Sequence, residues 1–215
     1  MTLPDSLPAQ LFLLACDRKK QRLVSRSELG YALRAAALAD LVLGGHLADD
    51  GGKAVPASPA PGLDPVLEEL LLEIGAAPPR PWRRWVRSRR SRMVPAVRDR
   101  LVAAHVVKVD THRALGLFPV HRIDVRRPQD ARRLLEDVRR AARSGHPAAR
   151  VDPRVGALTA IAGTAELGTV FSRAERRRYR ARFAELGRPV SPVVAALRKA
   201  IQSQRAVVAT TSGGG

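Results

Sequence analysis

The chain has 215 residues, of which 45% are hydrophobic and 27% charged, so it is long and apolar enough to bury one sizeable core. Its 38 Lys and Arg outnumber its 20 Asp and Glu, and a formal net charge of +18 attracts polyanions such as nucleic acid or anionic lipid. The single cysteine excludes a disulfide framework, and no signal peptide or membrane span is expected, so a reducing, cytoplasmic compartment fits best.

The N-terminal region contains the apolar run 11–16, followed by the expected start of a helix. Within that run, Cys16 is interpreted as a buried small hydrophobe, with a reactive thiol as the alternative. Ser25 and Glu28 have the spacing of a capping box, in which a hydroxyl and a carboxylate satisfy the first N–H groups of a helix. We therefore expect a helix to begin at Ser25.

Arg34 is an isolated charge in the almost wholly apolar segment 33–41. A guanidinium on such a helix has to be paired or has to reach a ligand, because burying an uncompensated charge is costly. Asp40 is six residues away and does not lie one turn along the same face, so it is a poor partner within the helix. A bound anion is the alternative partner.

A turn-rich stretch at 44–62 separates this helix from the next. It contains two Gly-Gly pairs and a proline-rich run, which predict a loop or a short hairpin with residues 56–62 mobile. Asp64 and Pro65 then provide an N-cap and a first-turn proline for a helix that ends at Gly75. The carboxylates of this helix lie opposite its apolar stripe, so they are predicted to form a solvated face: Glu68, Glu69 and Glu73.

Residues 80–100 form the densest basic segment, with nine arginines, the single acid Asp99 and both tryptophans of the chain. Guanidinium groups bind phosphate through two parallel hydrogen bonds, and an indole can lie at a membrane interface or stack on a base. The predicted membrane-surface contacts are Trp82, Arg83, Trp85, Arg87 and Arg90, of which the three arginines share one face of a continuous helix. The alternative is that one tryptophan packs into the core while the arginines are solvated.

The second half of the chain begins with a change to β-branched residues, which predicts a hairpin over 106–125. A basic helix at 80–100 followed by this hairpin also has the order of a nucleic-acid-binding winged helix. The weakly polar stretch 155–171 predicts a central helix that is buried all round. Further helix starts are expected at Asp152-Pro153, at the capping box of Ser172 with Glu175, and at Ser191-Pro192, with a disordered tail at 210–215.

Motifs of catalysis are absent from the sequence. It contains no phosphate-binding Gly-rich loop followed by Lys-Ser/Thr, no nucleophile elbow and no close pair of histidines. The five histidines are scattered, without acidic or cysteine neighbours at ligand spacing. We therefore expect a protein that is not an enzyme and that needs no cofactor or metal.

The order of several segments resembles the Golgi phosphoprotein 3 family, in its bacterial branch. The resemblance extends from about residue 7 to residue 208 and is carried by an ordered set of segments rather than by one motif. These segments are Leu11-Phe12-Leu13-Leu14-Ala15, the stretch 31–41 around Arg34, Gly45-His46-Leu47, 64–74, Trp85, Val97-Arg98-Asp99-Arg100-Leu101-Val102, 154–171 and the closing helix to Val208.

The resemblance implies a compact, mostly helical domain whose eukaryotic relatives bind phosphatidylinositol 4-phosphate and hold Golgi glycosyltransferases through their cytoplasmic tails. In those relatives the headgroup pocket combines an aromatic side chain before the first long helix, an arginine within it, and two arginines three positions apart on the later basic helix. Arg34 matches the first arginine and Arg98 the second of the pair. The aromatic position falls on Ser25 and the remaining arginine position on Pro95, for which Arg92 and Arg100 are the nearest substitutes.

The sequence therefore predicts a mainly α, compact domain over residues 1–209 with a helical-bundle core and one or two short β-hairpins. The predicted function is non-catalytic binding of a phosphoinositide or another phosphorylated anion by a peripheral membrane adaptor, with the headgroup held by Arg34, Arg92, Arg98 and Arg100. Its predicted partners are an anionic phospholipid surface and the cytoplasmic tails of membrane proteins. A winged-helix-like module that binds nucleic acid is the alternative.

Overall fold

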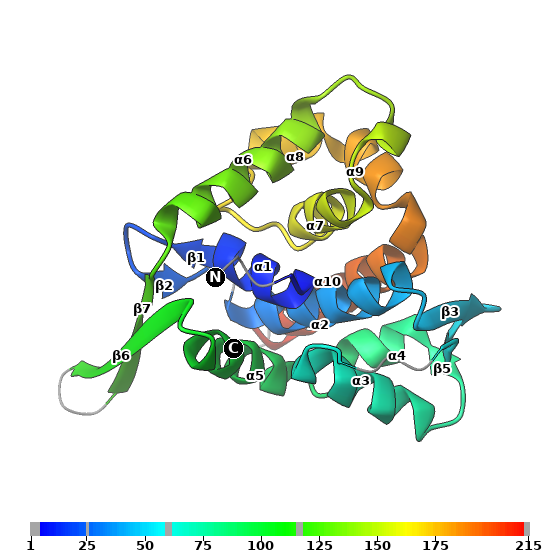
Figure 1. Ribbon diagram of the computed structural model, residues 1–215, viewed down its shortest axis with the longest axis horizontal. Helices are drawn as coiled ribbons and strands as arrows, with labels where there is room; N and C mark the ends of the chain where they lie inside the picture. The colour runs from blue at the N-terminus through cyan, green and yellow to red at the C-terminus, as the bar shows by residue number, and fades with distance from the viewer. Residues whose placement is uncertain (1–4, 25, 59–61, 115–117, 213–215) are drawn as a thin grey trace.

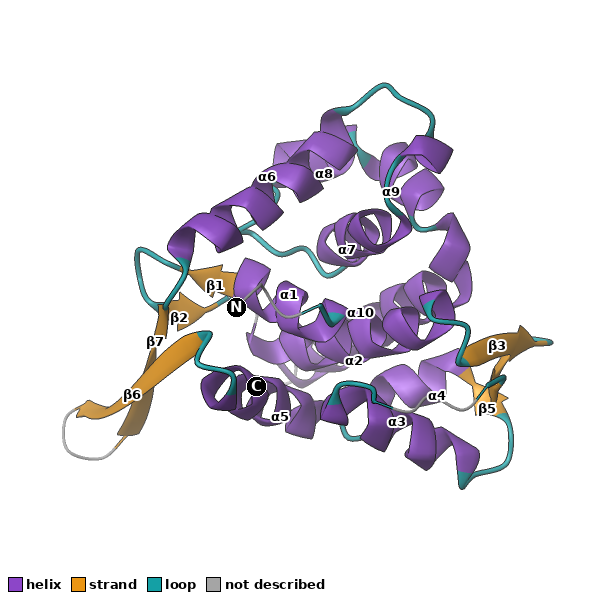
Figure 2. Ribbon diagram, viewed as in Figure 1, coloured by secondary structure: helices purple, strands orange, loops and turns teal. Residues whose placement is uncertain are grey.

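Helices make up most of the protein, and short antiparallel strand pairs lie at its edges (Figures 1 and 2). A computed structural model describes residues 5–24, 26–58, 62–114 and 118–212. The helices within these ranges are α1 (Leu7–Ala15), α2 (Arg26–Leu43), α3 (Pro65–Gly75), α4 (Trp82–Arg87), α5 (Arg90–Ala103), α6 (Pro128–Arg143), α7 (Pro153–Thr164), α8 (Arg173–Arg178), α9 (Arg180–Leu186) and α10 (Ser191–Ser212), with 3-10 turns η1 (Ala148–Arg150) and η2 (Arg188–Val190). The predicted mainly α fold is confirmed.

Helix α2 is the centre of the bundle, with α1 and α7 on one side and α3, α4 and α5 on the other (Figure 1). Helix α10 also packs on α2. Small side chains on α2 explain how so many helices pack on it, because they allow a shorter distance between helix axes. Five alanines of α2 are fully buried, and one hydrophobic core that contains them extends from Leu7 to Ile201: Ala32, Ala35, Ala36, Ala37 and Ala39.

Three of the predicted helix starts have the side-chain caps that the sequence indicated. The Asp64 carboxylate accepts a hydrogen bond from the Val66 N–H, and Asp152 accepts bonds from the first N–H groups of α7. Ser172 and Glu175 form a reciprocal capping box at α8. The box predicted at Ser25 falls on a residue outside the described ranges.

The predicted central helix is shorter than expected. Residues 156–163 of α7 are buried on every side, as predicted, but the helix ends at Thr164 and residues 165–171 continue as turns. Glu166 adopts a left-handed φ of 54°, which no α-helix continues through. The stretch 155–171 is therefore half helix and half connection.

Asp40, which the sequence identified as a poor partner for Arg34, bonds other groups. Its buried carboxylate accepts a 2.7 Å hydrogen bond from the Leu7 N–H at the start of α1. It also lies 2.6 Å from a guanidinium nitrogen of Arg154 on α7. Asp40 thus joins α1, α2 and α7.

Cys16 is buried at the end of α1, so the interpretation as a small hydrophobe is confirmed. Burial withdraws the thiolate from water and raises the pKa of Cys16 to about 12. The thiol is therefore protonated at neutral pH, which excludes the activated thiolate of the alternative interpretation.

Strands occur in three small antiparallel groups among the described residues. Strand β1 (Cys16–Asp17) pairs with β2 (Arg22–Leu23), and β3 (Leu47–Asp50) pairs with β4 (Lys53–Pro56), which also pairs with β5 (Arg80–Pro81). The predicted long hairpin is confirmed as β6 (Val107–Ala114) and β7 (Phe118–Val125). The segment expected to be mobile, 56–62, lies partly outside the described ranges.

The last helix extends further than expected. It begins at Ser191, as its Ser-Pro signal predicts, and continues to Ser212, so residues 210–212 are helical where a disordered tail was expected. Residues 213–215 lie outside the described part. Within the described ranges, no helix combines the length and the apolarity that crossing a membrane requires.

Candidate functional site

The arginine-rich segment 80–100 folds as two helices rather than one. Helix α4 ends at Arg87 and α5 begins at Arg90, with Arg89 between them in a left-handed conformation of φ 45°. The shared face predicted for Arg83, Arg87 and Arg90 is therefore wrong, because the third residue belongs to a different helix. Gly30 explains why α5 begins close to α2, since a Cβ at this glycine would lie 2.4 Å from the carbonyl oxygen of Arg90.

Both tryptophans lie in the core, contrary to the predicted membrane contact. The side chains of Trp82 and Trp85 belong to residues that are 3% and 2% exposed, and the Trp82 indole N–H donates to the Asp49 carboxylate. Positions 82, 85 and 86 share the inner face of α4, which leaves the arginines on its outer face. The alternative interpretation foresaw one buried tryptophan, and the structure buries both.

Arg34 is buried and fully engaged with protein groups. Its Nε donates to the Trp85 carbonyl oxygen at 3.0 Å, and its Nη2 donates to Glu73 Oε2 at 2.6 Å and to Ser88 Oγ at 3.0 Å. The residue is only 4% exposed. Of the two predicted possibilities, a partner or a ligand, the structure contains the partner.

Glu73 is that partner, and the solvated face predicted for it is wrong. Its side chain is 17% exposed, because Glu73 lies three residues after Leu70, at the edge of the face that α3 packs on α2, whereas Glu68 and Glu69 are exposed as predicted. Its second oxygen accepts a 3.2 Å hydrogen bond from Ser88 and lies 3.8 Å from Arg89. One carboxylate thus balances two arginines from α2 and the α4–α5 junction.

No local sequence signal identifies Glu73 or Ser88 as partners of Arg34. They are 39 and 54 residues away along the chain, and each is an ordinary polar residue of its own segment. The need for a partner could be predicted from the apolar surroundings of Arg34. Its identity depends on how α3 and α4 pack on α2.

The predicted headgroup arginines of α5 lie apart from Arg34. Arg98 bonds its neighbour Asp99 at 2.8 Å, and Arg100 lies 3.3 Å from Asp64 at the N-cap of α3. Arg98 is eight residues beyond the first residue of α5, which is about 12 Å along the helix axis. The structure therefore does not bring Arg34 and Arg98 to a common partner.

Arg90 and Arg92 continue the basic segment at the start of α5. The Arg90 guanidinium lies 4.6 Å from the centre of the Tyr31 ring, a cation–π contact that orients it, whereas Arg92 is exposed. Within the described part of the chain, four exposed arginines of these two helices have no carboxylate partner. We call them the α4–α5 arginine segment: Arg83, Arg84, Arg87 and Arg92.

The winged-helix alternative agrees with the structure only in the order of elements. Helix α5 does precede the β6–β7 hairpin. However, α5 packs on α1 and α2 as part of the bundle, rather than forming a separate small module with the hairpin. The nucleic-acid interpretation gains no support from this arrangement.

A mainly helical bundle with a basic surface defines only a broad class of binding proteins, and comparison with known proteins narrows it. The family model of Golgi phosphoprotein 3 (GPP34) matches residues 7–204. The chain belongs to this family, as its sequence resemblance predicted. No curated protein matches the chain significantly.

Proposed function

We propose that this protein is a non-catalytic, peripheral membrane protein that binds anionic phospholipid through the α4–α5 arginine segment. The observation that carries the proposal is a group of four exposed arginines on two consecutive helices, none of which pairs with a carboxylate among the residues that the structure describes. Membership in the Golgi phosphoprotein 3 family supports it. Arginine suits this task because its planar guanidinium matches the geometry of phosphate oxygens.

The arginine segment is large enough for reversible attachment. Each basic residue near an anionic leaflet contributes about 1 kcal/mol, so four contribute about 4 kcal/mol, or roughly a thousandfold in partitioning. Arg98 lies on the same helix as Arg92, and its only ion pair in the described part is with exposed Asp99. Arg92 and Arg98 are therefore the first candidates for direct phosphate contacts, and Arg100 is a third once it leaves Asp64, 3.3 Å away.

Arg34 enters the proposal as a positioning residue. Its bonds to the Trp85 carbonyl and to Ser88 hold the end of α4 against α2 and α3. A phosphate would have to displace the 2.6 Å pair with Glu73 to reach it. We assign headgroup contact to α5 and orientation of the segment to Arg34.

The proposal extends to the role of an adaptor. A protein held at a membrane by one face has other faces free for the cytoplasmic tails of membrane proteins, which are the second proposed partner. The family resemblance supports this adaptor role, and it also supports a phosphoinositide as the preferred lipid.

Flotation with vesicles tests the proposal. Phosphatidylcholine vesicles would be compared with vesicles that also contain phosphatidylserine or phosphatidylinositol 4-phosphate. The test variant replaces all four segment arginines with glutamine. The control variant removes four exposed arginines elsewhere and therefore has the same net charge: Arg126, Arg132, Arg133 and Arg150.

We expect the parent and the control to float with anionic vesicles and the test variant to lose at least about tenfold in binding. Equal losses in the two variants would show that attachment follows net charge alone and would contradict the proposed surface. A parallel measurement with duplex DNA at the same salt tests the alternative, which requires tight binding with a preferred sequence.

A further inference from the structure

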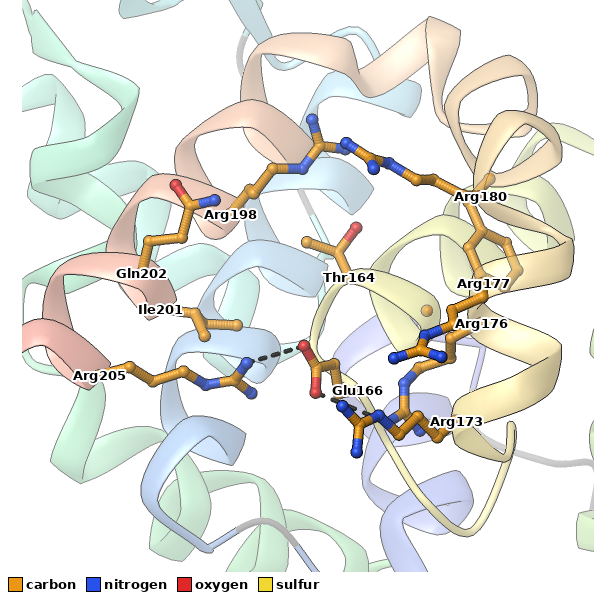
Figure 3. A pocket seen from close by; sticks show the side chains of 12 residues that line it. Thr164, Glu166, Arg173, Arg176, Arg177, Arg180, Arg198, Ile201, Gln202 and Arg205 are labelled. Atoms are coloured by element: carbon orange, nitrogen blue, oxygen red, sulfur yellow. Dashed lines mark hydrogen bonds and ion pairs between the residues drawn. The ribbon is translucent and has the colours of Figure 1, made fainter. Parts of the chain in front are cut away.

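A second basic feature lies away from the α4–α5 segment, in a pocket between the end of α7, helices α8 and α9, and helix α10 (Figure 3). Its volume is about 710 Å³, within the range of small-molecule sites. Six arginines and one carboxylate line it, a formal excess of five positive charges. The arginines are Arg173, Arg176, Arg177, Arg180, Arg198 and Arg205.

Helical spacing directs these arginines into the pocket from two sides. Arg173 and Arg176 are three residues apart on α8 and share a face with Arg177. Arg198 and Arg205 are seven residues apart on α10, two turns along one face. Side chains from both helices extend into the same space (Figure 3).

Glu166 shows that guanidinium groups from the two sides can meet at one anionic group. Its carboxylate accepts a 2.7 Å hydrogen bond from Arg205 and lies 3.6 Å from Arg176 (Figure 3). The bond from Arg205 is the main cause that lowers the pKa of Glu166, so the carboxylate is ionised at neutral pH. Glu166 thus occupies the place of a bound anion for these two arginines.

The other four arginines have no such partner. Arg173, Arg177, Arg180 and Arg198 are exposed and form no ion pair within the described ranges. Figure 3 shows the side chains of Arg180 and Arg198 extending toward one another across the pocket. Like charges that converge in this way repel each other, and an anion between them would reverse the sign of the interaction.

The floor of the pocket is apolar and closely packed. The side chains of Phe183 and Ile201 belong to buried residues, and the Phe183 ring lies 5.0 Å from that of Phe171. A Cβ at Gly163 would lie 2.5 Å from the Phe183 ring, so only glycine lets α7 approach it this closely. The charged side chains therefore surround an apolar base.

We propose that this pocket is a binding site for a compact polyanion that carries at least two phosphate groups. An excess of five charges exceeds what one phosphate neutralises, and bidentate guanidinium contacts favour phosphate oxygens. The volume suits a molecule of small-ligand size rather than a single ion. The site does not depend on the membrane surface proposed for α4 and α5.

Isothermal titration of the whole protein with inorganic triphosphate tests the site. The test variant is Arg180→Gln/Arg198→Gln, and the control is Arg132→Gln/Arg150→Gln, which removes two exposed arginines outside the pocket. A third variant, Glu166→Gln, frees Arg205 and Arg176 for the ligand. Thermal unfolding of each variant checks that it folds.

We expect saturable binding by the parent and the control, and at least about tenfold weaker binding by the Arg180/Arg198 variant, because two charged contacts with the ligand are removed. Glu166→Gln is expected to tighten binding about fivefold, a gain that partial unfolding could not produce. No binding by the parent, or equal losses in the test and control variants, would overturn the assignment, as would weaker binding by Glu166→Gln.

Two further titrations distinguish the source of the phosphates. Soluble inositol 1,4-bisphosphate represents a free metabolite, and vesicles with phosphatidylinositol 4-phosphate represent a lipid headgroup. The vesicles are used with the variant that lacks the α4–α5 arginines, so that only the pocket is measured. A pocket-dependent signal with vesicles assigns a lipid, and one with the soluble compound alone assigns a free phosphate ester; absence of both, together with no triphosphate binding, rejects the site.

Discussion

Arginine charge is compensated differently around Arg34 and in the pocket between α8 and α10. Arg34 is buried beside Glu73 at 2.6 Å and bonds a carbonyl and a hydroxyl as well, so its charge is compensated within the protein. In the pocket, six arginines surround one carboxylate. The number of arginines in a segment therefore does not locate an anion site. The absence of carboxylates around them is the better guide.

The largest expected effect is the loss of stability when the buried ion pair of Arg34 and Glu73 is broken. Replacing Arg34 with methionine keeps much of its volume but leaves largely buried Glu73 with one ion pair in the described part of the chain, to Arg89 at 3.8 Å. We expect the free energy of unfolding to fall by about 3 kcal/mol, as when one partner of a buried ion pair is removed. Urea denaturation measures this change.

The double variant Arg34→Met/Glu73→Leu is the matched control for that substitution. It removes both charges, so no buried carboxylate is left unpaired, and we expect it to recover most of the lost stability. If Arg34→Met alone were as stable as the parent, the charge of Glu73 would not depend on Arg34 for its compensation.

Gly→Ala substitutions at Gly30 and Gly163 compare the packing of α2 on α5 with that of the pocket floor. At Gly30 the new Cβ would lie 2.4 Å from a backbone oxygen of α5, and we expect a loss of about 3 kcal/mol, at the upper end for overpacking. At Gly163 the clash is with the Phe183 ring, which can shift, so we expect about 1 kcal/mol.

Gly168→Ala is the control for both glycine variants, since no atom lies within 4 Å of its Cβ position. We expect its midpoint of urea denaturation to match that of the parent. If Gly163→Ala proved more damaging than Gly30→Ala, the Phe183 ring at the pocket floor would be less able to shift than the backbone of α5, which would contradict this prediction.

The smallest expected effect is the loss, in acid, of the stability that Glu166 contributes. Its pKa is lowered in the folded protein, chiefly by the bond from Arg205, so its contribution to stability is present above about pH 4.3, the unfolded value, and is lost as the pH falls through the folded pKa. The side chain is 43% exposed, so this contribution is below about 1 kcal/mol.

Measuring the difference in unfolding free energy between the parent and Glu166→Gln from pH 7 to pH 3 tests this. We expect the parent to be more stable at neutral pH and the difference to vanish in acid. A difference that is constant with pH would show that the Glu166–Arg205 pair does not stabilise the fold. Glu175, whose pKa is lowered by Ser172 in the α8 capping box, is a comparison residue outside the pocket lining.

Local signals account for what the sequence predicted correctly. The caps at Asp64, Asp152 and Ser172 act within three residues, so their spacing alone indicated the helix starts. The β6–β7 hairpin also followed from its residue types. The break between α4 and α5 at Arg89 had no comparable signal, because the contact of Gly30 with Arg90 joins distant parts of the chain.

The candidate sites were harder to predict for the same reason. Arg34 visibly needed a partner, but Glu73 becomes that partner only when α3 packs on α2. The run Arg176-Arg177-Arg178 is obvious in the sequence, yet its meeting with Arg198 and Arg205 depends on the packing of α8 beside α10. The burial of both tryptophans could not be read from spacing alone, because either face of α4 could have been the inner one.

The most direct test of charge compensation is an anomalous difference map from crystals soaked in tungstate, whose oxygens resemble those of phosphate. We expect a peak between the arginines of α8–α9 and α10, near Arg180 and Arg198, and an intact pair between Arg34 and Glu73. A peak at Arg34 with Glu73 displaced, and none in the pocket, would contradict this expectation.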